Sequence, residues 1–424
     1  MANNFDSNFS RKLAARVLDS VENKRILSKN VNTQLLAGKF NPDSGENYDF
    51  KRPTDYKASR TSDGDISATT AQSIIRGKAT GTVQDYITVE TAFLEADEAL
   101  KMGKDENEFF DSMADRIVTD LEVDYAAYMM KNSGLLAGTP GNAVDGWDDV
   151  AEAGAVMESH GIPKDGMWCY SVNPYTQANL AGVQRSLGAA DPLVSSSHQN
   201  AIISSNFAGM KVMTATTLST YTLPATGDLV GAVNGAPTAT YVGAKDTMTQ
   251  SVTVDGFGSF SGTIPAGTVV KITGRNRLNL KTRQPIVNGA GANVEFTAVV
   301  TADATLTTGA GTLVISGPAI YEADGAYNTV DAAIADNDVI TILGADSAMY
   351  QPNLFWHKNA FSIGFVPMQK LYSTDTIATS KDGLQMRVSK GTSIRENKQI
   401  VRIDLRPAYA VLNPFFAGQG YGKA

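Results

Sequence analysis

The chain has 424 residues, of which 42% are hydrophobic and 19% are charged, and its formal net charge is −8. This length corresponds to roughly two to three domains, and the hydrophobic content is too high for a disordered chain. The single cysteine excludes an internal disulfide framework and a cysteine-based metal site, while the acidic balance disfavours a general nucleic-acid binder, which needs clustered Lys and Arg.

Targeting signals are not predicted. The first residues lack the basic-then-apolar pattern of a signal peptide, and no apolar run approaches the roughly 20 residues of a membrane span. We therefore expect a protein that folds in a reducing cytoplasm and has no membrane partner.

Residues 1–44 are predicted to form an N-terminal arm. Leu13, Val17 and Val21 recur at helical spacing within Phe9–Leu27. A helix of this kind is marginal alone, so it is either a solvated terminal helix or a docking arm. Basic residues surround the apolar ones: Arg11, Lys12, Arg16, Lys24 and Arg25.

Residues 45–91 are polar and predict a long two-stranded excursion. Tyr48 and Phe50 lie on the outgoing limb, Val83 and Ile87 lie on the return limb, and Ser62–Asp65 has turn chemistry. Because such a hairpin is unstable by itself in water, we expect it to lie on a neighbouring subunit.

The clearest helix is predicted for Asn107–Lys131. Acidic residues crowd its start, where the helix dipole favours negative charge. It is longer than the mean helix of about 12 residues and therefore needs a long packing surface. Apolar residues recur at every fourth position: Phe109, Met113, Ile117, Leu121, Tyr125 and Met129.

An α/β segment follows this helix. Helices are predicted for Trp147–His160 and for Asn173–Leu187, where Pro174 suits a first turn. A buried strand is predicted between them at Met167–Val172, and a short strand at Met210–Met213.

From about Ala215 to Met349 the composition shifts to Thr, Val, Gly, Ala and Asp, without a convincing amphipathic helix. The spacing of the predicted strands indicates a β-barrel or sandwich, with long loops at Gly243–Gln250 and Arg275–Ala290. The predicted strands are Leu218–Leu223, Thr238–Val242, Gln250–Val254, Thr268–Thr273, Val294–Val300, Leu313–Ile315 and Asp338–Ile342.

Mixed character returns after this block, with strands predicted at Asn353–Trp356, Phe361–Val366, Leu384–Val388 and Gln399–Leu405. The β-rich block is therefore inserted into an α+β host. Such an insertion is tolerated where the host's chain ends lie close together.

The sequence contains no convincing catalytic constellation. His160 falls at a predicted helix C-terminus, where a cation is favoured, and His198 follows serines that lack a glycine-flanked nucleophile elbow. His357 is expected to be structural, and Cys169 to be a buried inert thiol. We expect no enzyme, no cofactor and no metal ion. The cluster Arg275, Arg277, Lys281 and Arg283 could contact nucleic acid or pair with acidic neighbours.

Three short motifs carry a resemblance to a known family. They are Asp105-Glu-Asn-Glu-Phe-Phe110, Tyr170-Ser-Val-Asn-Pro174, and Asn353-Leu-Phe-Trp356 followed by Ala360. Each is similar to a segment of the P-twenty-two-like coat proteins of short-tailed enteric phages. Together with the order of elements, they make the chain resemble the tailed-phage major capsid proteins of the Hong Kong ninety-seven-type fold, in the branch with an inserted I-domain.

The resemblance implies an α+β capsid fold in five parts. The N-terminal arm spans 1–44 and the E-loop 45–91. The peripheral (P) domain comprises 92–139 and 368–424, with a spine helix at about 107–131. The axial (A) domain comprises 140–214 and 350–367, and an all-β barrel, the I-domain, spans 215–349.

The resemblance also implies a function: a major capsid protein that self-assembles into the hexamers and pentamers of an icosahedral virion shell in the host bacterial cytoplasm. The implied partners are further copies of the chain, a scaffolding protein, a portal protein and packaged double-stranded DNA at the inner surface. Scaffold docking falls on the arm, with Arg11, Lys12, Arg16, Asp19 and Glu22 as candidates. Contact between capsomers falls on the loop Gly243–Val254, with Lys245 and Asp246 as candidates.

A second class remains open at this point. Thr/Gly/Val-rich β domains are also common in secreted or surface-layer structural proteins, where they form β-sandwich adhesion modules. The missing signal-peptide pattern argues against this alternative.

Overall fold

The structure, a computed structural model, describes residues 15, 17–21, 24–33, 47–67, 72–94, 106–185, 206–371, 375–379, 384–393 and 398–423. For 93–94, 106–110, 184–185 and 392–393 it describes the backbone only. The chain divides into two compact units. The first comprises Met1–Tyr48, Gly81–Ala126 and Phe361–Ala410, and the second comprises Asp49–Thr80, Ala127–Ala360 and Val411–Ala424.

The described helices are α3 (Glu106–Lys131), α4 (Trp147–Ser159), α5 (Pro174–Arg185), α7 (Tyr241–Ala244) and the 3-10 helix η4 (Pro414–Phe416). The strands up to the barrel are β1 (Asn47–Lys51), β2 (Lys78–Val83), β3 (Ile87–Leu94), β4 (Leu135–Ala137), β5 (Trp168–Val172), β6 (Lys211–Thr214) and β7 (Tyr221–Thr222). The next strands are β8 (Val230–Val233), β9 (Thr249–Asp255), β10 (Gly262–Ile264), β11 (Val269–Asn276), β12 (Glu295–Val300), β13 (Ala304–Leu306), β14 (Gly311–Ser316) and β15 (Val339–Ile342). The last strands are β16 (Met349–Tyr350), β17 (Asn353–His357), β18 (Phe361–Phe365), β19 (Thr376–Thr379), β20 (Gln385–Ser393), β21 (Lys398–Leu405), β22 (Pro407–Val411) and β23 (Ala417–Gly420).

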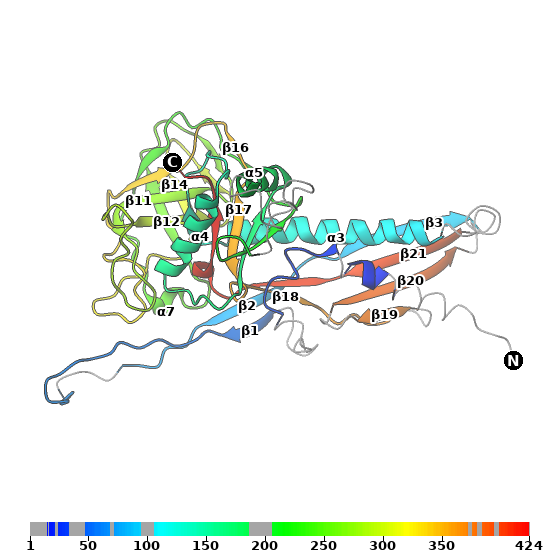
Figure 1. Cartoon of the computed structure of the whole chain (residues 1–424), viewed down its shortest axis with the longest axis horizontal. Helices are drawn as coiled ribbons and strands as arrows, with labels where there is room; N and C mark the ends of the chain where they lie inside the picture. Colours follow the sequence, from blue (N-terminus) through cyan, green and yellow to red (C-terminus); the bar gives the residue numbers. More distant parts are fainter. Residues whose placement is uncertain are drawn as a thin grey trace. The chain divides into compact units, whose positions relative to one another are not determined.

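The first unit is built on an antiparallel sheet of order β19-β20-β21-β3, with α3 running alongside it (Figure 1). The apolar stripe of α3 explains this packing, because residues four apart share one helix face. Met113, Ile117, Leu121, Tyr125 and Met129 are buried, whereas the side chain of Phe109 lies outside the described residues.

A buried charge cluster marks the register of this sheet. Asp404 of β21 lies directly opposite Arg387 of β20 and Thr88 of β3. Its carboxylate accepts hydrogen bonds from Arg387 Nε at 3.1 Å, Arg402 Nε at 2.6 Å and Thr88 Oγ1 at 2.9 Å. Burial alone raises the pKa of Asp404, but these donors outweigh it and lower the pKa. A one-residue slip would turn Asp404 to the other face, so the cluster specifies the pairing.

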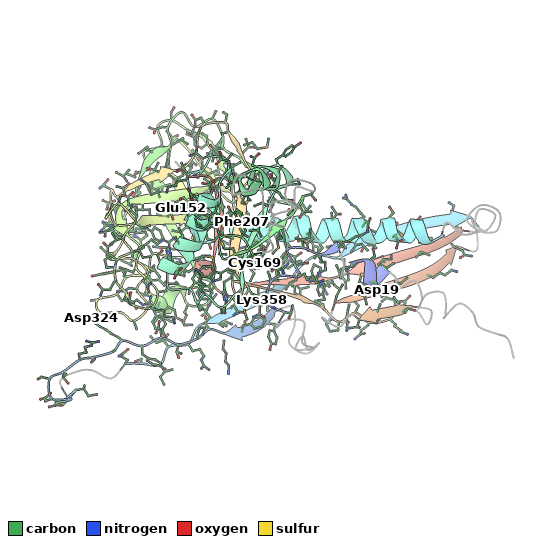
Figure 2. The ribbon with its side chains drawn as sticks, in the orientation of Figure 1. Asp19, Glu152, Cys169, Phe207, Asp324 and Lys358 are labelled. Atoms are coloured by element: carbon green, nitrogen blue, oxygen red, sulfur yellow. The ribbon has the colours of Figure 1, made fainter. Side chains whose placement is uncertain are left out.

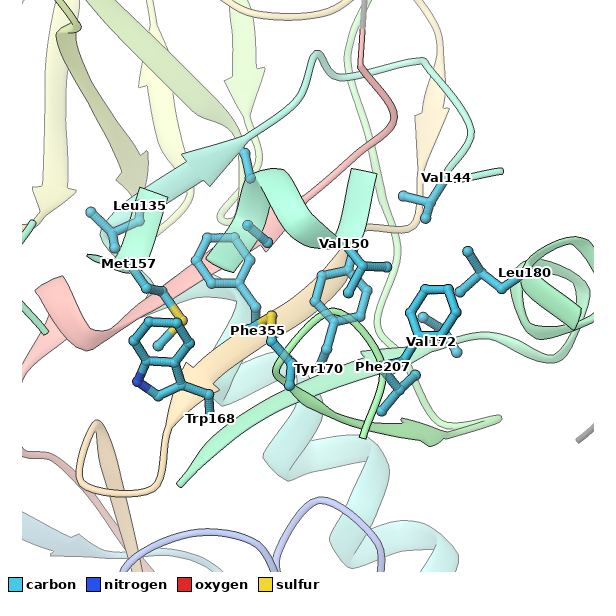
Figure 3. Close-up of a cluster of buried hydrophobic side chains, with 14 of the residues drawn as sticks. Leu135, Val144, Val150, Met157, Trp168, Tyr170, Val172, Leu180, Phe207 and Phe355 are labelled. Atoms are coloured by element: carbon cyan, nitrogen blue, oxygen red, sulfur yellow. The ribbon is translucent and has the colours of Figure 1, made fainter. Parts of the chain in front are cut away.

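The second unit holds a five-stranded sheet of order β4-β23-β17-β5-β6. Every residue of β5 and of β17 is buried, as expected for central strands covered on both faces. Trp168, Tyr170 and Phe355 form the aromatic centre of its core; Met157 of α4 lies beside Trp168, and Leu180 of α5 lies beside Phe207 in the same cluster (Figure 3).

The same unit contains a closed six-stranded barrel of order β11-β12-β14-β9-β8-β15. Its strands alternate as barrel strands must: along β9, Val252 and Val254 point into the buried interior while their neighbours are exposed or half-buried. The expected all-β barrel is therefore present, and the open choice between barrel and sandwich is decided in favour of a barrel.

Most elements predicted from periodicity are present, but one predicted strand is wrong and several short strands were not predicted. Thr238–Val242 is not a strand: the Thr240 hydroxyl accepts the Gly243 N–H and caps the helical turn α7. β8 and β23 were not predicted, because short glycine-containing segments lack an apolar alternation.

The units also divide the chain differently from the predicted P and A domains. Residues 411–424 belong with the five-stranded sheet, because β23 pairs with β17 and β4. β18 belongs to the first unit, within a sheet of order β1-β2-β22-β18.

The predicted excursion is strand-like only where it starts and ends. We call residues 49–80 the limb; it lies within the second unit. β1 and β2 pair at its base, and the described residues from Arg52 to Gly77 contain no strand. Gly64 turns the chain with φ +77°, within the predicted turn.

We predict that Leu121→Ala destabilises the subunit by about 2–5 kcal/mol, because it removes a fully buried side chain and leaves a cavity. Val123→Ala on the same helix is the matched control: Val123 is 47% exposed, and its truncation should change stability by less than about 0.5 kcal/mol. Urea unfolding of the two variants measures the difference. Equal losses would contradict the burial of this helix face.

Candidate assembly surfaces

The base of the limb is anchored by a buried arginine. The guanidinium of Arg52 is enclosed, and it donates to the carbonyl oxygens of Lys78 at 3.2 Å, of Val411 at 3.3 Å and of Leu412. Burial lowers the pKa of Arg52 to about 10, so it keeps its charge at neutral pH. A side chain that satisfies three carbonyls from two chain segments fixes the place where the limb begins.

The predicted intercapsomer candidates are engaged within the chain. The Asp246 carboxylate accepts the backbone N–H of Lys78 at 3.0 Å and the Lys245 Nζ at 2.6 Å. These hydrogen bonds, the one from Lys245 first, lower the pKa of Asp246. Beside them, Gly77 packs so closely that a Cβ there would lie 2.4 Å from the Lys245 carbonyl oxygen. Lys245 and Asp246 thus contact the return side of the limb.

The outgoing side of the limb contacts the barrel at a different place. Asp55 pairs with Arg283 Nη2 at 3.0 Å, and its backbone N–H donates to the Tyr327 hydroxyl at 2.9 Å. Further along, Lys57 pairs with Asp324 at 2.6 Å; Figure 2 labels Asp324 beside the limb. The Lys57–Asp324 pair is largely solvent-exposed and contributes little.

The described part of the N-terminal arm packs within the first unit. The backbone N–H groups of Leu27 and Ser28 donate to the two carboxylate oxygens of Glu122, at 2.7 and 3.1 Å. Arg25 lies 5.6 Å from the centre of the Phe365 ring. Glu122 was not predicted, although a buried carboxylate on an apolar helix face indicates a dedicated partner.

The scaffold-docking candidates are only partly visible. Asp19 is exposed, whereas Arg11, Lys12, Arg16 and Glu22 lie outside the described residues. The described residues therefore do not test this set, and it stays a prediction.

A second buried arginine, Arg277, joins the barrel to the residue that precedes β4 of the five-stranded sheet, within the second unit. Arg277 Nη2 donates to the carbonyl oxygens of Gly134, at 2.7 Å, and of Thr297. Its guanidinium lies 4.6 Å from the ring centre of Phe296 and 5.6 Å from that of Phe415. Burial lowers the pKa of Arg277 to about 9. Of the predicted basic cluster, Arg277 is thus enclosed rather than available to nucleic acid.

His160 follows α4 close to this arginine. Its Nδ1 donates to the Val156 carbonyl oxygen at 2.7 Å. Burial, and then the charge of Arg277, lower the pKa of His160 to about 3. Burial thus outweighs the preference of a helix C-terminus for a cation, and the imidazole is neutral at pH 7.

The remaining candidates for chemistry are Cys169, His357 and His198. Figure 2 labels Cys169. Burial raises the pKa of its thiol to about 11, so this thiol is a poor nucleophile at neutral pH. His357 Nε2 lies 3.1 Å from the Asp165 carboxylate, and His198 lies outside the described residues. Within the described part of the chain, no group of three or more His, Cys, Asp or Glu residues is placed to hold a metal ion. The helices of that part include none long and apolar enough to cross a membrane.

Comparison with known proteins assigns the family. Residues 1–422 match the family described as "P22 coat protein - gene protein 5". The chain is also 36% identical over 428 residues to the major capsid protein of Acyrthosiphon pisum secondary endosymbiont phage 1, with 100% of both chains covered. The chain belongs to the P22 coat protein family, whose members are structural capsid proteins. The predicted resemblance to the tailed-phage major capsid proteins is confirmed, and this match argues against the surface-layer alternative.

Solved phage capsid proteins are more distant. The chain is similar to one from Mycobacterium phage Che8, with a TM-score of 0.49 and 10% identity over 93% of this chain and 90% of that chain. It is also similar to the capsid of Ralstonia phage GP4, with a TM-score of 0.43 and 9% identity over 94% and 90% of the two chains. At these values the family assignment rests on the sequence matches.

We predict that His160 makes the subunit less stable below pH 6.5. The unfolded histidine binds a proton near its ordinary pKa of 6.5, while the folded one resists protonation until about pH 3. Stability is therefore lost as the pH falls from 6.5 towards 3, by about 1 kcal/mol between pH 7.5 and 5.5. Urea unfolding at both pH values should show that loss in the natural chain and a smaller one in His160→Gln. Equal losses in the two proteins would contradict a neutral buried imidazole.

Proposed function

We propose that copies of this chain assemble into the icosahedral shell of a phage virion in the bacterial cytoplasm, around packaged double-stranded DNA. Family membership supports this proposal, and the observation that carries it is the limb. Tyr56, Ile66 and Ile74 on the limb are 53%, 60% and 76% exposed. Burying apolar surface is favourable by roughly 25 cal/mol per Å², so a second copy that covers these side chains stabilises the shell.

The inserted barrel corresponds, in this proposal, to an I-domain over residues 215–349 that braces the axial domain. Contacts within the second unit support the brace. Asn279 Nδ2 donates to the Ser159 carbonyl oxygen at 2.8 Å, and the Leu280 N–H donates to that of His160 at 3.1 Å. Each ties the barrel to a segment outside it by a bond to backbone.

Assembly in this proposal uses a scaffolding protein that docks on the N-terminal arm, and a portal protein at one vertex. The arm carries Arg11, Lys12 and Arg16 in a chain whose net charge is −8, so the arm is suited to an acidic partner surface. Complementary charge gives such a contact register and orientation. At that net charge the shell encloses DNA without binding it strongly.

We expect charge reversal on the arm, Arg11→Glu with Lys12→Glu and Arg16→Glu, to reduce scaffold incorporation at least tenfold while the subunit stays folded. Reversal is preferable to deletion, because Val17 is buried and a deletion would also remove packing. Lys281→Glu, an exposed lysine on a barrel loop, is the control.

The measurement is co-expression with the neighbouring genes of the phage, followed by sedimentation and negative-stain electron microscopy. Shells from the natural chain and from the Lys281→Glu control, with scaffold missing from the arm variant, support the proposal. If the natural chain forms no shells in the presence of its partners, the capsid function fails. If the arm variant incorporates scaffold normally, the docking site is elsewhere.

A further inference from the structure

The limb needs an external support to have a defined direction. Between Lys51 and Lys78 its described residues form no strand, and a single two-stranded ribbon of this length is unstable in water. The limb's contacts to the barrel are therefore what can hold it in place. They fall into two groups, one on each side of the limb.

On the return side the barrel offers the loop 241–248, and the limb offers backbone. Asp246 accepts the Lys78 N–H at 3.0 Å, and Gly77 leaves no room for a Cβ against the Lys245 carbonyl oxygen. The Arg52 N–H in turn donates to the Gly77 carbonyl oxygen at 2.9 Å. The contact with Asp246 thus holds the return side of the limb base directly, and the outgoing side through the hydrogen bond between Arg52 and Gly77.

On the outgoing side a single hydroxyl joins both sides of the limb. Tyr327 Oη accepts the Asp55 N–H at 2.9 Å and donates to the Ile75 carbonyl oxygen at 3.2 Å. The ring of Tyr327 is held by stacking on Tyr241, with centroids 3.6 Å apart and planes 3° from parallel. Tyr241 lies in the same loop as Asp246, so the two contacts share one support.

The charged contact beside Tyr327 is also pre-organised. Arg283 pairs with the Asp55 carboxylate at 3.0 Å while its Nη1 donates to the Asn328 carbonyl oxygen at 2.7 Å. The guanidinium is therefore fixed by the barrel before it meets the limb, which reduces the entropy lost on contact.

We propose that the barrel positions the limb within each unassembled subunit, and that Tyr327 and Asp246 are the positioning residues. The barrel then decides where the exposed Ile66 and Ile74 are presented to a second copy. In this role Asp246 acts inside its own chain, in contrast to a contact between capsomers. The consequence for shells rests on the proposed function, but the positioning itself exists in the free subunit.

Hydrogen exchange of the purified, unassembled subunit tests the proposal, read by mass spectrometry on peptides covering 52–57 and 76–80. For each variant, exchange is measured at the limb–barrel contact that does not include the substituted residue. Tyr327→Phe removes one hydroxyl and should speed exchange at Lys78 roughly fivefold to tenfold, the effect of losing about one net hydrogen bond. Asp246→Ala should speed exchange at Asp55 by a similar factor.

Matched controls lie in the second unit, outside these contacts. Tyr175→Phe alters a tyrosine of α5 that is 85% exposed. Asp336→Ala removes a carboxylate that accepts the Gly235 N–H at 2.7 Å, which is the same chemistry without the limb. Both controls should leave limb exchange unchanged.

If exchange at the distant contact is unchanged in both Tyr327→Phe and Asp246→Ala, the proposal is overturned. If the Asp246→Ala variant in that case also fails to form shells, Asp246 acts between chains. Faster exchange at the limb alone supports positioning, even if the natural chain forms no shells. If Asp246→Ala also exchanges faster throughout the barrel, the milder Tyr327→Phe, which loses a single oxygen, decides the outcome.

Discussion

The insertion of the barrel depends on one constraint in the five-stranded sheet: the chain leaves from β6 and returns at β17, and β5 lies between them. Thr214 at the end of β6 pairs with Val172, and Leu354 at the start of β17 pairs with the adjacent Ser171. Exit and return are therefore at the same end of the sheet, about 10 Å apart across two strand spacings. A domain whose own ends are close can enter there without breaking a strand pair.

That geometry places the barrel but does not immobilise it, and buried polar contacts supply the rest. Arg277 is the largest of them. Removing a cation from water costs several kcal/mol unless it is compensated, and here two carbonyl oxygens and two aromatic faces provide the compensation. A lysine could not replace it, since an ammonium lacks the planar face that lies against Phe296 and Phe415. Burial first, and then the charge of Arg277, lower the pKa of His160, which links the barrel to the end of α4.

Local pattern predicted those parts of the fold in which one residue period dominates. The stripe of α3 and the apolar runs of β5 and β17 are of this kind. The turn α7 escaped prediction because a single Thr240 cap outweighs the β-propensity of its neighbours. β23 escaped because its pairing to β17 and β4 is a long-range property of a glycine-containing segment.

The candidate surfaces were harder to predict, because their partners are remote in sequence. Asp246 was predicted as a contact residue between capsomers, yet its partner within the chain, Lys78, lies 168 residues earlier. Glu122 accepts from Ser28, 94 residues away, and nothing in the arm's own pattern indicates it. Charge and spacing identify which residues can make a polar contact; only the tertiary structure shows which contact each residue makes.

At several of their contacts, the limb and the barrel contribute different kinds of group. At Lys78, Ile75 and Gly77 the limb contributes backbone, and the barrel contributes the side chains of Tyr327 and Asp246 together with the Lys245 carbonyl. Backbone groups are present whatever the side chain. The limb surface that meets a neighbouring copy can therefore change in sequence without loss of these anchors, provided that the close approach at Gly77 is kept. Substitutions on the barrel side have no such freedom, because each removes an anchor. The direction of the limb is thus encoded jointly by these barrel residues and by the limb side chains Arg52 and Asp55, and the surface that it presents is encoded in the limb itself.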